Sequence, residues 1–108
     1  WWFYTEGLGF ADQNRINTED FNEVMLTQTA NAFTLVLYHH TDQREVQLGN
    51  GWGPLGFIVR DCAGSHAALI AAGADEVRPP TTFDAMTVSF VNDPEGHEIE
   101  LLQLPASA

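Results

Sequence analysis

The sequence predicts an α+β fold made of two similar modules, each a helix followed by three strands. Each module contains a helix-like stretch that ends at a glycine, Gly9 in the first and Gly73 in the second. Val36 lies 27 positions after Gly9 (36 − 9 = 27), within a strand-like run. Glu100 lies 27 positions after Gly73 (100 − 73 = 27), again within such a run. A single offset of 64 positions (100 − 36 = 64) therefore relates the two modules.

The first module begins with the stretch WWFYTEGLGF, whose Gly9 is suited to ending a helix of which this is the second half. Residues 11–20 are polar and form a strand or a loop. Residues 21–28 and 33–40 are rich in β-branched, aromatic and long apolar side chains, which favours two strands. Core packing is expected of the clustered aromatic residues, with a cavity or dimer contact as the alternatives: Trp1, Trp2, Phe3 and Tyr4.

A polar stretch over 41–53 leads to the second module, whose first strand is expected at 54–61. Asp61 is a good N-cap for a helix that ends at Gly73. The spacing predicts that one face of this helix packs on a sheet, with the residues Ala63, His66, Ala67 and Ile70. Cys62 is interpreted as an inert packing residue, although a first-turn position would lower the pKa of a thiol.

Three strand-like runs complete the second module. The run over 75–84 is expected to be a strand interrupted by Pro79 and Pro80. Residues 85–92 and 97–103 form two further strands, joined by DPEG, which has proline and glycine at the second and fourth positions of a type I turn.

The first strand of the second module has no counterpart in the first. The offset would put the counterpart of Pro54 at position −10 (54 − 64 = −10), before Trp1. We therefore expect the sequence to be an N-terminally incomplete part of a longer polypeptide. Within it, we expect a single domain over 1–108, with module one at 1–48 and module two at 49–108.

Charge and hydropathy exclude several classes of protein. Fifteen acidic residues against four basic ones give a formal charge of −11, which disfavours binding to a phosphate backbone. The same charge attracts a cationic ligand, although acidity also serves solubility. No apolar run approaches the roughly 20 residues that span a bilayer, and no signal peptide is evident. With its single Cys62, the chain is expected to be a soluble cytoplasmic protein.

The order of these elements resembles the vicinal oxygen chelate superfamily, which includes glyoxalase I, extradiol dioxygenases, fosfomycin-resistance enzymes and bleomycin-resistance proteins. The resemblance rests on FYTEGLGF, GFIVRDCAGSHAALIAAGA and FVNDPEGHEIELLQ. It implies paired βαβββ modules whose mixed sheet curls around a cavity, usually in a homodimer that binds a small molecule.

The resemblance also implies metal ligands on the first and last strands of each module. Carried over by position, these are Glu100, Val36 and Pro54, with the fourth position before the start of the sequence. Valine and proline have no side-chain lone pair, so half of the usual site is lost. We therefore expect no cofactor, with one divalent metal ion held in part by Glu100 as the alternative.

Strand alternation indicates which side chains face the implied cavity, because residues two apart share a face. The predicted ligand-binding residues are Val36, Tyr38, His40, Ile58, Arg60, Glu98, Glu100 and Leu102. Pro54 and Gly56 share the phase of Ile58 and Arg60. His39 next to His40 is not read as a metal motif, because neighbouring strand residues point to opposite faces.

Three of these residues are candidates for catalysis. Apolar neighbours disfavour the charged form of Glu100 and thereby suit its carboxyl group to proton transfer. Tyr38 or His40 would polarise a substrate oxygen. The simpler alternatives are a solvated strand-face carboxylate for Glu100, a strand-end histidine in water for His40, and a solvated strand end for Arg60.

Two functions follow from this reading. The first is sequestration of a small, possibly cationic or apolar molecule in a metal-free cavity, as in antibiotic resistance of the bleomycin type. The second is a glyoxalase-type lyase or isomerase in which Glu100 moves a proton, with or without a divalent metal. A purely structural module is the third and weakest reading, and the resemblance in fold does not decide among them.

Overall fold

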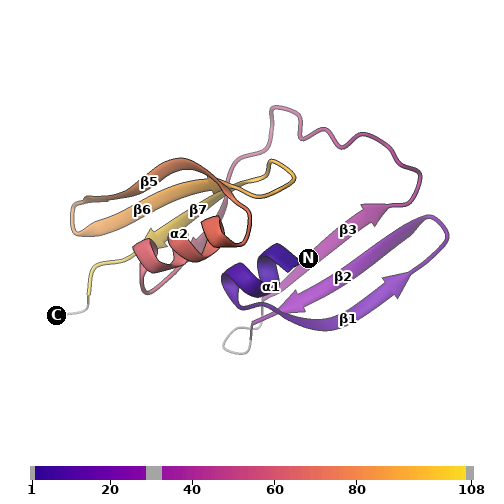
Figure 1. Cartoon of the computed structure of the whole chain (residues 1–108), viewed down its shortest axis with the longest axis horizontal. Coiled ribbons are helices and arrows are strands. Elements are labelled where there is room, and N and C mark those ends of the chain that lie inside the picture. The colour runs from indigo at the N-terminus through magenta and orange to yellow at the C-terminus, as the bar shows by residue number, and fades with distance from the viewer. Residues whose placement is uncertain (1, 29–32, 107–108) are drawn as a thin grey trace. The chain divides into compact units, whose positions relative to one another are not determined.

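The protein consists of two compact units, each with its own helix and its own sheet (Figure 1). The computed structural model describes residues 2–28 and 33–106. Unit 1 covers residues 1–47 and unit 2 covers residues 48–108. The predicted α+β class is confirmed, as is the order of a helix followed by three strands in each unit, with one further strand before the helix of unit 2. Of the helices in the described residues, none has the length and apolar character to cross a membrane.

Unit 1 contains a three-stranded antiparallel sheet. Helix α1 (Trp2–Leu8) precedes the strands β1 (Ala11–Asn17), β2 (Phe21–Thr27) and β3 (Thr34–His40), which pair in the order β1-β2-β3. Gly9 follows α1 with a φ of 72°, a left-handed conformation that glycine adopts without steric cost and that ends the helix as expected.

Aromatic side chains form most of the core of unit 1. The rings of Phe3 and Tyr4 meet edge to face at 5.0 Å, and those of Tyr4 and Phe10 at 6.5 Å. All three side chains are buried, together with Leu26 of β2. Core packing is therefore confirmed for Phe3 and Tyr4, whereas Trp2 is 52% exposed and Trp1 lies outside the described residues.

Unit 2 is a four-stranded mixed sheet with one helix. Its elements are β4 (Leu55–Ile58), α2 (Cys62–Ala71), β5 (Asp75–Phe83), β6 (Met86–Asn92) and β7 (Glu98–Gln103). The strand order is β4-β7-β6-β5, with β4 parallel to β7 and the other pairs antiparallel. Unit 2 therefore has the βαβββ order that the family resemblance implies.

Helix α2 begins at the predicted cap and packs on the sheet. The Asp61 carboxylate accepts a hydrogen bond from Gly64 N at 3.0 Å. A side chain at Gly64 would collide with this carboxylate, so the glycine makes room for the cap. The helix contacts β5, β6 and β7. The buried side chains between helix and sheet are Cys62, His66, Leu69, Ser89, Val91, Ile99 and Leu101.

The predicted buried face of α2 is wrong by about one residue. His66 is buried as expected, but Ala63, Ala67 and Ile70 are exposed. Their places in the core are taken by Cys62 and Leu69. Burying Cys62 and Leu69 removes more apolar surface from water than burying Ala63 and Ala67 does, so the helix turns that stripe inward and leaves Ile70 39% exposed.

Strand β5 continues through Pro79 and Pro80, where an interruption was predicted. The two prolines instead coincide with a shift in the pairing register between Arg78 and Thr81. β5 is an edge strand, so a residue without an N–H is tolerated there.

The turn between β6 and β7 is organised by Asp93 as well as by its proline and glycine. Gly96 N donates to Asp93 O at 2.9 Å, which closes the predicted four-residue turn. The Asp93 carboxylate, only 4% exposed, also accepts from Glu95 N at 3.0 Å and His97 N at 2.8 Å. The His97 ring lies against the same carboxylate, with Nδ1 3.1 Å from Oδ2. The start of β7 is thereby fixed relative to β6.

Replacing Asp93 by alanine is expected to lower the free energy of unfolding by about 1–3 kcal/mol, because the N–H groups of Glu95 and His97 lose the buried carboxylate that accepts their hydrogen bonds. Asp93→Asn retains one oxygen acceptor and is expected to lower the free energy of unfolding by less. The measurement is the urea unfolding midpoint at neutral pH. Glu95→Ala, at an exposed turn position, is the control and should stay within about 0.5 kcal/mol of the parent. Equal midpoints for Asp93→Ala and the parent would contradict this role.

Candidate functional site

The site residues predicted from the sequence fall into two groups, one in each unit. Val36, Tyr38 and His40 lie on β3 of unit 1. The second group lies on or beside β4 and β7 of unit 2, and consists of Ile58, Arg60, Glu98, Glu100 and Leu102.

In unit 1, aromatic contacts confirm that alternate residues of β3 share a face. The rings of Tyr38 and His40 meet at 4.8 Å with an interplanar angle of 67°. The ring of Phe21 on β2 also stacks on Tyr38, at 4.8 Å and 20°. Val36 and Tyr38 are each 49% exposed, so this face presents apolar and aromatic surface to solvent. Sequence reasoning missed Phe21, whose pairing with His40 depends on the register of β2 against β3.

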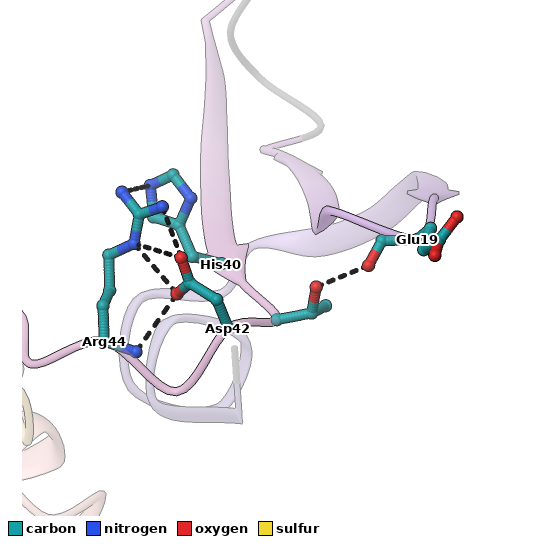
Figure 2. Close-up of polar contacts among 5 residues, drawn as sticks. Glu19, His40, Asp42 and Arg44 are labelled. Atoms are coloured by element: carbon teal, nitrogen blue, oxygen red, sulfur yellow. Dashed lines mark hydrogen bonds and ion pairs between the residues drawn. The ribbon is translucent and has the colours of Figure 1, made fainter.

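An ion pair after β3 reaches the His40 ring (Figure 2). Arg44 binds the Asp42 carboxylate through Nε, 2.9 Å from Oδ1, and through Nη2, 2.6 Å from Oδ2. Its Nη1 lies 3.5 Å from His40 Nε2. A guanidinium group only donates, so this contact favours the His40 tautomer with its proton on Nδ1. The hydrogen bond from Thr41 Oγ1 to Glu19 O, 2.6 Å long, anchors the chain between His40 and the pair.

The Arg44 guanidinium lowers the pKa of Asp42 to about 2, chiefly through its side-chain hydrogen bonds. Asp42 is therefore ionised throughout the neutral range. The carboxylate in turn raises the pKa of Arg44. The pair adds a positive and a negative group beside His40 that were not predicted from the sequence.

In unit 2, Glu100 lies at the centre of one sheet face. It pairs with Gly56 on β4 and with Phe90 on β6. Its Oε1 lies 3.6 Å from where a Cβ on Gly56 would be, so the absent side chain leaves space for the carboxylate above β4. Within residues 2–28 and 33–106, the Glu100 side chain has no hydrogen-bond or ion-pair partner. Glu100 is thus available to a ligand.

The neighbours of Glu100 on this face are mainly apolar. Leu102 pairs with Ile58 on β4 and with Val88 on β6. Ile58 is 70% exposed and Leu102 is half-buried. Glu98, also half-buried, pairs with Asn92 and brings a second carboxylate toward the turn. We call the side chains of Ile58, Phe90, Glu98, Glu100 and Leu102 the open face of unit 2.

Arg60 lies beyond the end of β4. The hydrogen bond from Val59 N to Leu102 O, 2.9 Å long, follows the pairing of β4 with β7. The exposed Arg60 comes next, in the bend before α2. An anion-holding role for Arg60 therefore requires a ligand that extends past the strand end.

The side chains at the implied metal positions do not fit a divalent cation. Pro54 precedes β4, and the residue of β4 that pairs with Glu100 is Gly56. Neither residue, nor Val36 on β3, has a side-chain donor atom, whereas a catalytic zinc site normally has three protein ligands. Among residues 2–28 and 33–106, no three histidine, cysteine, aspartate or glutamate side chains lie close enough to share an ion.

A groove of about 420 Å³ opens at the turn end of the open face. It is bounded by the segment before β4 and by the end of the β6–β7 hairpin, and its lining residues are Leu48, Gly49, Trp52, Gly53, Pro54, Asn92, Gly96 and Glu98. Of the predicted site residues, Glu98 is the one that lines it.

The sequence profile of the Glyoxalase/Bleomycin resistance protein/Dioxygenase superfamily matches residues 2–101. The chain belongs to this superfamily. The resemblance seen in the sequence is therefore confirmed at the level of the superfamily. Curated protein sequences gave no match.

Solved structures share the fold of this superfamily member. Glyoxalase I from Zea mays is 20% identical with a TM-score of 0.82, over 97% of this chain and 40% of that one. A glyoxalase family protein from Bacillus cereus is 16% identical with a TM-score of 0.79, over 94% and 82%. A glyoxalase/bleomycin resistance protein from Albidiferax ferrireducens is 26% identical with a TM-score of 0.70, over 96% and 86%. The chain thus spans less than half of the maize enzyme.

The ion pair beside His40 gives a testable pKa. Carbon-13 NMR should find that the Asp42 carboxyl titrates near pH 2, and Arg44→Gln should raise this pKa toward 3.8. Because the folded-state pKa is lowered, any stability from this pair is present above pH 3.8 and is lost as the pH falls through about 2. Arg15→Gln, which removes the partner of Asp12, is the control and should leave Asp42 unchanged. A pKa near 3.8 in the parent protein would refute the pairing.

Proposed function

We propose that this superfamily member binds a small, partly apolar or cationic molecule without a metal, in the manner of a sequestering resistance protein. The observation that carries the proposal is the Glu100 carboxylate, which lies over Gly56 on the open face with no partner among the described residues. A carboxylate among apolar side chains is suited to binding a ligand that combines a cationic or hydrogen-bonding group with an apolar body.

The remaining predicted residues have distinct roles in this proposal. Within unit 2, Ile58 and Leu102 provide apolar contact beside Glu100. Glu98 and Arg60 of the same unit provide polar contacts at the edges of the ligand. The fold relatives named above include a glyoxalase/bleomycin resistance protein from Albidiferax ferrireducens, which supports the resistance reading by analogy. We further propose that the protein acts as a homodimer in the cytoplasm.

The charge of the chain supports a cationic ligand. A formal charge of −11 gives the protein a negative field that raises the local concentration of cations and speeds their association. Such steering is screened by salt, with a Debye length of about 8 Å at physiological ionic strength. Binding of a cation should therefore weaken as salt is added, whereas binding of a neutral ligand should not.

A lyase or isomerase of the glyoxalase type is the second candidate. It is favoured by the same unpartnered Glu100, because a carboxylate without a fixed partner is able to accept a proton from a carbon next to a carbonyl. In this case Glu100→Gln would lower turnover by about 100-fold or more, because the base is lost.

Equilibrium titration with bleomycin and a panel of smaller aromatic cations tests the sequestration proposal. Saturable binding to at least one compound is expected, with affinity that falls as salt rises. Glu100→Gln should weaken binding of a cation by about tenfold, as one desolvated charge contact is lost, and binding of a neutral probe by about threefold at most.

A control variant and a metal analysis complete this test. Glu95→Gln removes one exposed carboxylate from the turn and should leave binding unchanged, because Glu95 is not part of the open face. No saturable binding to any compound would reject sequestration. Metal analysis of the purified protein is the second arm, because stoichiometric nickel, zinc, iron or manganese would contradict the metal-free site.

A further inference from the structure

The groove beside the open face has the chemistry of a site for small quaternary ammonium groups. We propose that Trp52 and Glu98 bind an alkylammonium cation in this groove, separately from the ligand of Glu100. The proposal goes beyond the function proposed above, because it concerns the groove and Trp52, shares only Glu98 with the open face, and holds whether or not Glu100 binds a ligand.

The two walls of the groove differ in secondary structure. One wall is the end of the β6–β7 hairpin, where Asn92 and Glu98 form a cross-strand pair and both line the groove. The turn bonds of Asp93 hold this wall: Asp93 N donates to His97 O at 2.8 Å, and Gly96 N donates to Asp93 O at 2.9 Å. The carboxylate of Glu98 thus projects from a fixed backbone.

The other wall is the segment before β4, which has no regular secondary structure. It carries Trp52, the one aromatic residue among those that line the groove, and Trp52 is 63% exposed. Gly49 and Gly53 flank it in the lining and have no side chains that would fill the space. The indole face is therefore accessible from the groove.

Charge complementarity indicates which ligand fits. The lining contains one carboxylate, Glu98, and no basic side chain. Among the described residues, Glu98 has no hydrogen-bond or ion-pair partner. An indole face attracts a cation through its quadrupole, and tryptophan does so best among the aromatic residues. A carboxylate and an indole around one groove match an alkylammonium cation, because the carboxylate balances its charge and the indole face contacts its methyl or methylene groups.

The groove is large enough for such a ligand. Its volume of about 420 Å³ lies within the range of small-molecule sites. Leu48, which is 38% exposed, adds an apolar contact for an alkyl chain attached to the cation. Since the groove is open to solvent, we expect weak binding, in the millimolar range.

Titration with choline, followed by NMR at the indole N–H signal of Trp52, tests the proposal. 3,3-Dimethyl-1-butanol is the neutral control, because it replaces the quaternary nitrogen by carbon with almost the same shape. Choline is expected to shift the Trp52 signal in a saturable manner, with at least about tenfold higher affinity than the alcohol. Added sodium chloride should weaken the binding of choline but not that of the alcohol.

Variants assign the binding to the two side chains. Trp52→Ala and Glu98→Gln should each lower the affinity for choline by about fivefold or more, read from a second groove signal such as the side-chain amide of Asn92. Trp52→Phe should lower the affinity for choline by about twofold, because a smaller ring retains part of the attraction. Glu95→Gln is the matched control and should have no effect. Trp52 is exposed, so its variants should keep the unfolding midpoint of the parent.

Each contrary result overturns the proposal. Equal affinity for choline and the alcohol would exclude cation recognition. Unchanged binding in Trp52→Ala or in Glu98→Gln would exclude this groove. A larger loss in Glu100→Gln than in Glu98→Gln would assign choline to the open face, which contradicts the groove site and leaves the function proposed for Glu100 standing.

Discussion

The alternation of side chains along β7 is the constraint on which unit 2 depends. Ile99 and Leu101 are fully buried on the side that α2 covers, whereas Glu98, Glu100 and Leu102 lie on the open face. β7 is also a central strand, with β4 on one side and β6 on the other. A slip of one residue would bury two carboxylates and expose two apolar side chains, so the register of β7 is strongly specified.

This constraint also decides what chemistry the open face offers. Glu100 is held at the middle of the face because Ile99 and Leu101 fix the strand beneath it. Gly56, its partner on β4, gives the carboxylate space but no second donor atom. A single carboxylate with apolar neighbours is suited to contact with a cation or to proton transfer. Of Glu100, Gly56 and the apolar neighbours, only Glu100 has a side chain that is able to hold a divalent metal.

Local signals in the sequence sufficed for much of the fold. The Asp61 cap, the end of α1 at Gly9 and the DPEG turn are set by residues within a few positions of one another, so they were predictable from composition and spacing. Strand alternation correctly assigned Tyr38 and His40 to one face of β3. The membership in the superfamily followed from the order of these elements.

The features that were missed depend on contacts between distant segments. The stacking of Phe21 on Tyr38 requires the register of two strands, and the groove joins a loop containing Trp52 to a hairpin more than forty residues later in the sequence. The buried face of α2 was misassigned because alanine-rich helices have only a small difference in hydrophobicity between neighbouring stripes, and the sheet selects the stripe with Cys62 and Leu69. The position of Arg44 beside His40 depends on how the chain folds after β3, and no short motif specifies that fold.

The two faces of the sheet in unit 2 are tested most directly by methyl NMR with a soluble nitroxide in solution. The nitroxide broadens signals that it can approach, and Ile58 and Ile99 are isoleucines on opposite faces, 70% and 0% exposed. The account predicts strong broadening of the Ile58 methyl signals and almost none for Ile99. Equal broadening of the two, or stronger broadening of Ile99, would contradict the alternation on which the open face and its site depend.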